Sequence, residues 1–371
     1  MATLDEVLRR IKTLKPPRYA AGNEVHSIDG PIGMLDAWAL IEAVRICCDL
    51  PQEYQGILKQ LGEFVRRSAP LKFTKLDRAT VAVQLLARVL NNSLVSQESF
   101  GICGPAAIAM ETAHNRPLEY CKIATQLAED GQSMLGKLVL KPNQRILDYD
   151  PGKSIPQVDW MVCASIRNES TNLEKEFSKE VYGGSTLEDV FHWMVKAGYR
   201  NVIGVCHQVF AQAVFAHPSG IRPPGLLPED KDGAFRTLKE LRAKGWHIFM
   251  GCNMSLQNGI QQMKMGETFA REMEGGEAVL EQTKKKVVES LGTENLGRFQ
   301  TLVKVGKSLV TGGSVGEGHW VYLEQLDTAM LDESMFTVTV CSHGQRFRSV
   351  NVPAAGFINK YYGFVAVTDL A

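Results

Sequence analysis

The segment SFGICGPAAIAM, residues 99–110, places a cysteine directly before Gly-Pro and a run of helix-forming residues. Gly104 allows a sharp backbone turn and Pro105 is favoured at the first helical position, so we expect a helix to begin at Pro105. Only the thiolate of cysteine is a strong nucleophile, and the positive end of a helix dipole lowers a thiol pKa. Cys103 is therefore a candidate nucleophile. The alternative is a small buried residue in a loop-to-helix turn.

Two other residues would complement a nucleophile at Cys103. Gln97 lies six positions earlier in a polar loop, and His319 opens the predicted strand HWVYLEQL after the glycine-rich segment TGGSVGEG. Thiolate attack on a carbonyl creates an oxyanion, which the Gln97 NH₂ and the Cys103 backbone N–H could bind. A histidine at the start of a facing strand could take the proton of the thiol. The alternatives are a solvent-facing glutamine and a buried histidine beside Trp320.

Together, Gln97, Cys103 and His319 resemble the papain-like cysteine peptidases. The segments CGPAAIAM and GHWVYL are most similar to bacteriocin-leader peptidases and related bacterial peptidases, and STLEDVFHWMVKAGYRNV resembles the helix and strand between their catalytic elements. The resemblance covers residues 95–370. It implies an α+β, papain-like cysteine peptidase fold and a protein or peptide substrate.

The third catalytic position departs from that family. An Asp or Asn on the strand after the histidine orients the imidazole there, whereas MFTVTVCSHGQ offers Cys341, Ser342 or His343. We take Ser342 as the orienting residue, because its hydroxyl can accept a hydrogen bond from the imidazole. An acid from the loop after the His319 strand, Asp327 or Asp332, is the alternative.

These residues predict a thiol hydrolase that cleaves peptide (amide) bonds. Cys103 attacks, His319 takes the thiol proton and returns it to the leaving amine, and Gln97 binds the oxyanion. Two other functions stay open. The same pair of residues could catalyse glutamine deamidation or a transglutaminase-like acyl transfer, and a catalytically decayed domain would act as a binding module.

Competing motifs are incomplete. GGSVG at 312–316 matches the G-x-S-x-G of serine hydrolases, but that motif needs a helix after the serine and a strand is predicted here. GKS at 306–308 lacks the upstream glycine of a phosphate-binding loop. The chain contains no H-E-x-x-H segment, and its cysteines and histidines lack zinc-ligand spacing. We therefore expect no metal and no cofactor.

Two regions must position the candidate residues. Residues 1–94 are predicted as a helical N-terminal region, because MLDAWALIEAVRICCDL and LDRATVAVQLLARVL repeat apolar residues at helical spacing. Residues 95–371 are predicted as the papain-like catalytic domain. A helical insertion around 255–305 accounts for the long separation between Cys103 and His319.

Within residues 95–371, helices and strands are predicted in a mixed order that indicates an α+β fold. One helix runs from Pro117 to Gly131, and another has a capping box at Ser185 and Glu188 and ends at Gly198. FRTLKELRAKG is a further helix. Strands are predicted at VDWMVCASI (158–166), NVIGVC, WHIFMGC, HWVYLEQL, MFTVTVCS, RSVNVP and YYGFVAV.

The composition limits where the protein acts. The 371 residues include 41 basic and 41 acidic residues, so no basic surface for nucleic acid is expected. The N-terminus lacks a signal peptide, no apolar run could span a membrane, and the eight cysteines form no C-x-x-C pair. We expect cytoplasmic synthesis with reduced thiols. A bacterial effector or toxin exported by a non-Sec secretion system also fits, with an inhibitory or immunity protein as its partner.

Overall fold

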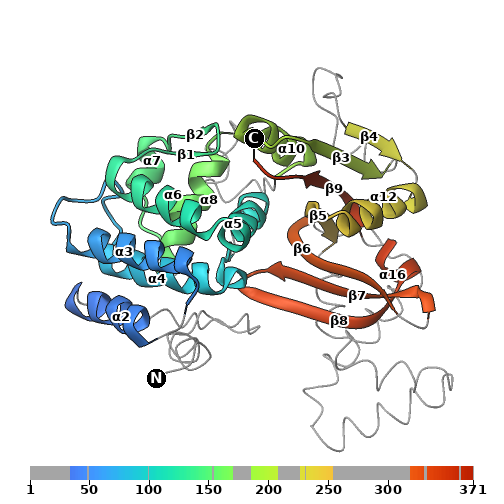
Figure 1. The fold of residues 1–371 in the computed structure, drawn as a ribbon. Coiled ribbons are helices and arrows are strands. Elements are labelled where there is room, and N and C mark those ends of the chain that lie inside the picture. Colours follow the sequence, from blue (N-terminus) through green and yellow to red (C-terminus); the bar gives the residue numbers. More distant parts are fainter. Residues whose placement is uncertain are drawn as a thin grey trace, which may run out of the picture.

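The structure is a computed structural model that describes residues 34–47, 50–98, 100–152, 154–169, 185–207, 226–229, 231–253, 318–329, 332–358 and 361–370. The described chain forms a helical part and a part built on a seven-stranded sheet, and α5 (Cys103–Asn115) lies where they meet (Figure 1). This mixture confirms the predicted α+β class. The predicted helical insertion around 255–305 lies outside the described residues.

The helical part combines helices with one small hairpin. Its elements are α2 (Met34–Cys47), α3 (Gln52–Arg66), α4 (Arg78–Leu90), the 3₁₀ turn η1 (Asn92–Leu94), α5, α6 (Pro117–Asp130), β1 (Ser133–Leu135), β2 (Leu138–Leu140), α7 (Gln144–Leu147), α8 (Gln157–Arg167) and α10 (Leu187–Ala197). Helices α2 and α4 cover the two segments predicted as helical within residues 1–94. None of the helices in the described part of the chain is long and apolar enough to cross a membrane.

Helix α5 begins two residues before the predicted position. Its first residue is Cys103, so Pro105 lies in the third position rather than the first. Proline is tolerated there because the first four N–H groups of a helix have no partner within the helix. Helix α6 matches its prediction, with Pro117 at its start and Gly131 at its end in the left-handed conformation (φ 69°).

The capping of α10 differs by one residue from the prediction. The capping box joins Thr186 and Asp189 rather than Ser185 and Glu188, because Thr186 is the last residue outside the helix. Gly198 ends the helix as predicted, with a φ of 85° that a residue with a side chain rarely adopts.

Residues 158–166, predicted as a strand, instead form most of α8. The helix is buried along almost its whole length, so its sequence lacks the alternating polar face that identifies a surface helix. Its one acidic residue, Asp159, is fully buried as well. A continuous apolar segment cannot by itself distinguish a buried strand from a buried helix.

The sheet has the strand order β4-β3-β9-β5-β6-β7-β8. Its strands are β3 (Val202–His207), β4 (Leu226–Glu229), β5 (His247–Asn253), β6 (Gly318–Ala329), β7 (Asp332–Ser342), β8 (Gln345–Pro353) and β9 (Tyr361–Val367). β3 and β4 pair in parallel, and every other pair is antiparallel. The strands predicted in this part of the chain are confirmed, as is the helix α12 (Lys231–Ala243).

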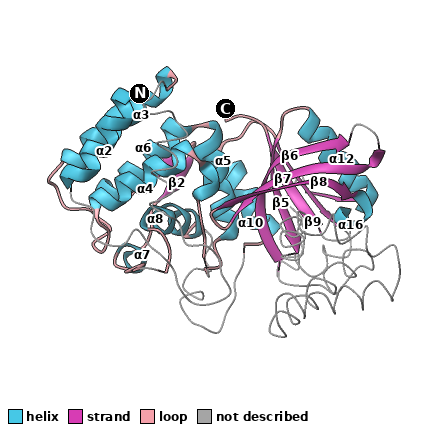
Figure 2. Cartoon of the chain, turned by 90° about the horizontal axis from the view of Figure 1, so that it is seen from below, coloured by secondary structure: helices cyan, strands magenta, loops and turns pink. Residues whose placement is uncertain are grey.

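The sheet is covered on both faces. Figure 2 shows α5 and α10 on one side, and α12 and α16 (Ala354–Ile358) on the other. Side chains alternate along β6: Trp320 and Tyr322 belong to the core shared with the helical part, whereas Val321 and Leu323 belong to the core beneath α12. β6 therefore joins both cores, and it carries His319 as its second residue, paired with Cys252 of β5.

The larger core crosses the predicted domain boundary. Leu61 of α3 and Val83 of α4 belong to the same buried cluster as Ile123 of α6 and Cys163 of α8. The division at residues 94 and 95 stays a prediction about domains. In the structure, the residues on its two sides pack together.

A buried ion pair connects this core to the loop after α4. Asp159 is fully buried, and its two oxygens lie 2.5 and 2.6 Å from Nε and an NH₂ nitrogen of Arg88. The same carboxylate accepts the backbone N–H of Ser96 at 2.9 Å. The pair therefore fixes α4, α8 and the Ser96 segment relative to one another.

We expect Asp159→Ala to lower the free energy of unfolding by about 3–5 kcal/mol, because it leaves the Arg88 charge buried without a partner. The double variant Arg88→Met/Asp159→Leu removes both charges and should recover most of that loss. Urea unfolding followed by circular dichroism measures both. Equal destabilisation of the single and double variants would contradict the charge-pair explanation.

Candidate active site

The sulfur of Cys103 lies among backbone N–H groups from three elements. Gly104 in α5, Ser185 before α10 and Trp320 in β6 each donate a hydrogen bond to it. Cys103 as a whole residue is 4% exposed. Burial raises the pKa of the Cys103 thiol, and the three N–H groups act in the opposite direction. The expectation that the helix start gives a low net pKa is therefore wrong, because desolvation outweighs the dipoles.

The other cysteines whose side chains are described lie in different surroundings. Burial raises the pKa of Cys121 to about 12 and that of Cys341 to about 12. Burial also raises the pKa of the Cys163 and Cys252 thiols. Within the described chain, backbone N–H groups favour a thiolate at Cys103 but not at these four positions.

Close packing holds the three donors around the sulfur. A Cβ atom placed on Gly104 would lie 2.7 Å from both Cβ and Oγ of Ser185, so only glycine allows this approach. The indole N–H of Trp320 donates to the carbonyl oxygen of Ser185 at 2.7 Å. The start of α5, the residue before α10 and β6 are thereby fixed together.

His319, near the start of β6, contacts Ser342, the last residue of β7. Nε2 of His319 lies 2.5 Å from Oγ of Ser342, and both side chains are buried. The N–H that Trp320 donates to Cys103 belongs to the peptide group joining His319 to Trp320. The backbone at His319 therefore lies near the Cys103 sulfur, and the His319 side chain contacts Ser342. Proton transfer between Cys103 and His319 stays a prediction.

The surroundings of His319 keep it uncharged. Burial, and secondarily the neighbouring His343, lower the pKa of His319 well below its usual value. In the tautomer that carries its proton on Nε2, Ser342 accepts that proton's hydrogen bond and Nδ1 keeps its lone pair. Such an imidazole has the protonation state that a general base needs.

The alternatives for the third position are not at this site. Asp327 lies eight residues beyond His319 on the same strand, about 26 Å along an extended chain. Its side chain is exposed and accepts a hydrogen bond from Gln325. Asp332 pairs with Ala329, still farther along β6.

The loop that carries Gln97 packs beside the same cluster. Gln97 is half-buried, and its carbonyl oxygen accepts the N–H of Phe100 at 3.0 Å. Two residues earlier, the carbonyl of Val95 accepts the N–H of Gly344, in the turn that follows Ser342. The loop is thus in place, and oxyanion binding by the Gln97 side chain stays a prediction.

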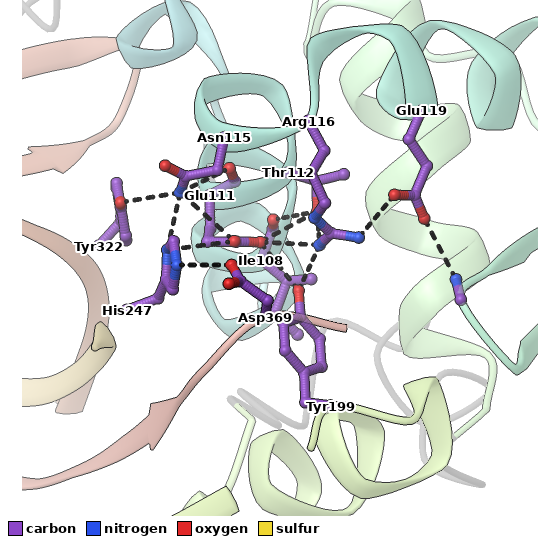
Figure 3. A network of polar contacts seen from close by, with 11 residues as sticks. Ile108, Glu111, Thr112, Asn115, Arg116, Glu119, Tyr199, His247, Tyr322 and Asp369 are labelled. Atoms are coloured by element: carbon purple, nitrogen blue, oxygen red, sulfur yellow. Dashed lines mark hydrogen bonds and ion pairs between the residues drawn. The ribbon is translucent and has the colours of Figure 1, made fainter. Parts of the chain in front are cut away.

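Sequence reasoning missed the polar network at the other end of α5 (Figure 3). It contains Glu111, Thr112, Asn115, Arg116, Glu119, Tyr199, His247, Tyr322 and Asp369. Buried Glu111 accepts from Arg116 at 3.0 Å and from Tyr199 at 2.9 Å. Asn115 donates to the Tyr322 hydroxyl at 3.2 Å. These bonds fix the orientation of α5 against the sheet. No sequence motif marks them, because their members are far apart in the chain.

Within the described residues, no group of three or more His, Cys, Asp or Glu side chains is arranged to hold a metal ion. Comparison of the chain with protein-family models, with curated proteins and with solved structures finds no match.

We expect Gly104→Ala to destabilise the protein by about 1–3 kcal/mol, because its methyl group would overlap Ser185. Gly62→Ala, inside α3, is the matched control: the nearest atom to its added carbon is Glu42 Oε1 at 3.7 Å. That variant should be stabilised by about 0.5–1 kcal/mol, as helix propensity predicts. Thermal unfolding compares the two. A similar gain in both variants would contradict the tight contact at Gly104.

Proposed function

We propose that the protein is a papain-like thiol hydrolase that cleaves peptide (amide) bonds. The observation that carries the proposal is the position of Cys103 beside the backbone of His319, whose side chain contacts Ser342. The Cys103 sulfur lies against the peptide group after His319, and His319 Nε2 is 2.5 Å from Ser342 Oγ. The proposed nucleophile is the first residue of a helix that packs on a mostly antiparallel sheet, and the proposed base lies on that sheet. This arrangement also supports a papain-like fold.

In the proposed reaction, the resting pair is a neutral thiol and a neutral imidazole. Burial raises the pKa of Cys103 and lowers that of His319, so a separated thiolate and imidazolium are disfavoured at rest. His319 takes the thiol proton as the sulfur attacks the carbonyl carbon. As the sulfur bonds to the carbonyl carbon, the three N–H groups have two courses. They either donate to the tetrahedral intermediate instead of the sulfur, or stay hydrogen-bonded to the sulfur atom of the forming thioester.

The second half of the reaction releases the amine. Gln97 and the Cys103 backbone N–H bind the oxyanion, and collapse of the tetrahedral intermediate breaks the C–N bond. His319 gives its proton to the leaving nitrogen. A water molecule, deprotonated by His319, then hydrolyses the thioester and restores the thiol.

Ser342 orients the imidazole in this scheme. Its hydroxyl fixes the tautomer, but it stabilises imidazolium less than a carboxylate would. The buried surroundings fit this choice, because a carboxylate at the same place would itself be desolvated. Export by a non-Sec system and an inhibitory or immunity partner remain predictions that the site does not address.

The test of the proposed function is a proteome treated with the purified wild type or with Cys103→Ala. We expect new peptide termini in the wild-type sample only, since the variant lacks the nucleophile; mass spectrometry detects them. Glutamine converted to glutamate without chain cleavage would favour a deamidase instead. Identical samples would contradict both enzymatic proposals and favour a binding module.

With a cleaved peptide as substrate, Ser342→Ala should lower kcat about tenfold, the effect of losing one hydrogen bond. His319→Ala should abolish turnover, because it removes the base. Steady-state kinetics measure both variants. A silent Ser342→Ala would show that another group orients His319.

A further inference from the structure

The ring of His343 stacks face to face on the ring of His319. The ring centroids are 4.5 Å apart and the planes differ by 10°. His343 lies in the turn between β7 and β8 and adopts a φ of 46°, a left-handed conformation in which Asn, Asp and His are enriched among residues with side chains. The next residue, Gly344, donates its N–H to Val95 at 3.0 Å. The turn is therefore held in the conformation that places one imidazole over the other.

The stack changes the surroundings of the base on one whole face. Ser342 contacts the edge of the His319 ring, and His343 covers a face of it. Two imidazoles at this separation do not both accept protons readily, because like charges repel in a desolvated site. Burial lowers the pKa of His343 to about 4, so its ring is neutral at neutral pH.

The other titratable groups in this part of the site are two thiols and one carboxyl group. Cys252 is the direct partner of His319 on β5, and Cys103, at the start of α5, lies near Cys252 and near the peptide group that joins His319 to Trp320. Glu98, on the Gln97 loop, accepts a hydrogen bond from the Ser96 hydroxyl at 2.8 Å and interacts with Arg88 and Asp159. Among the described residues, His343 is the titratable group whose ring stacks directly on His319.

We propose that His343 is a positioning residue for His319: its neutral ring excludes water from one face of the base and keeps the base uncharged until it accepts the Cys103 proton. This inference rests on the proposed function.

Two variants distinguish the effect of the His343 ring from the effect of the turn that holds it. His343→Asn keeps a residue that tolerates the left-handed turn and removes the aromatic face. His343→Phe keeps an aromatic face that cannot be protonated. His192→Asn, the same change at an exposed histidine of α10, is the matched control.

The first measurement is the pKa of His319, from NMR titration of ¹⁵N-histidine-labelled protein. In His343→Asn, water reaches the His319 ring and its pKa should rise by about one unit, towards the ordinary value of about 6.5. In His343→Phe and in His192→Asn it should stay as in the wild type. A general base acts only when it is deprotonated. The acid limb of the pH profile of kcat/KM should therefore move to higher pH by the same amount in His343→Asn, and in neither of the other two variants.

The result that overturns the inference is a His319 pKa that is the same in the wild type and in His343→Asn. If His343→Asn does not fold, as judged by NMR dispersion, His343→Phe decides alone: a raised His319 pKa in that folded variant overturns the inference. The titration needs no substrate. A shifted pKa in a protein that cleaves no amide bond would contradict the proposed function and leave the effect of His343 on His319 standing.

Discussion

The carboxylate of Asp159 is the group on which the arrangement of the site depends most. It is fully buried, binds the guanidinium of Arg88 through both oxygens and accepts the N–H of Ser96. Ser96 directly precedes Gln97, and Val95 holds the turn that places His343 on His319. One buried charge in the helical part thus fixes the loop that reaches the sheet. Such a charge is stable only when its partners are in place, so the loop has little freedom to move.

Exclusion of water is the second constraint, and it acts on both members of the Cys103–His319 pair. Desolvation disfavours the thiolate and the imidazolium alike, so it would make the site inert without compensation. In the proposed reaction, the N–H groups around the sulfur and the hydroxyl of Ser342 would supply part of that compensation as fixed dipoles. Fixed dipoles need no reorganisation when charge develops, which is why a buried site can favour the charged transition state over the neutral ground state.

The sequence predicts those elements whose boundaries have a local cause. Gly131 and Gly198 end helices because of backbone conformations that glycine adopts, and the alternation in the C-terminal segments identifies strands. Local causes could not identify residues 158–166 as a helix. A helix that is buried on all sides has no polar face, so its apolar residues do not recur at helical spacing. Ser342 could be selected by its place on the strand after His319. The stacking of His343 depends on strand register and on a turn conformation, and neither is encoded in a local pattern.

The position of β9 has a consequence for the life of the protein on the ribosome. β9 follows all the other described strands in the chain, yet it lies in the middle of the sheet between β3 and β5. A nascent chain that has already released Cys103 and His319 from the exit tunnel therefore cannot close the sheet until residues 361–367 emerge. Pairings of such long sequence separation form slowly. If the proposed hydrolase function holds, the sheet that carries His319 would be completed only at the end of translation, when β9 takes its central place.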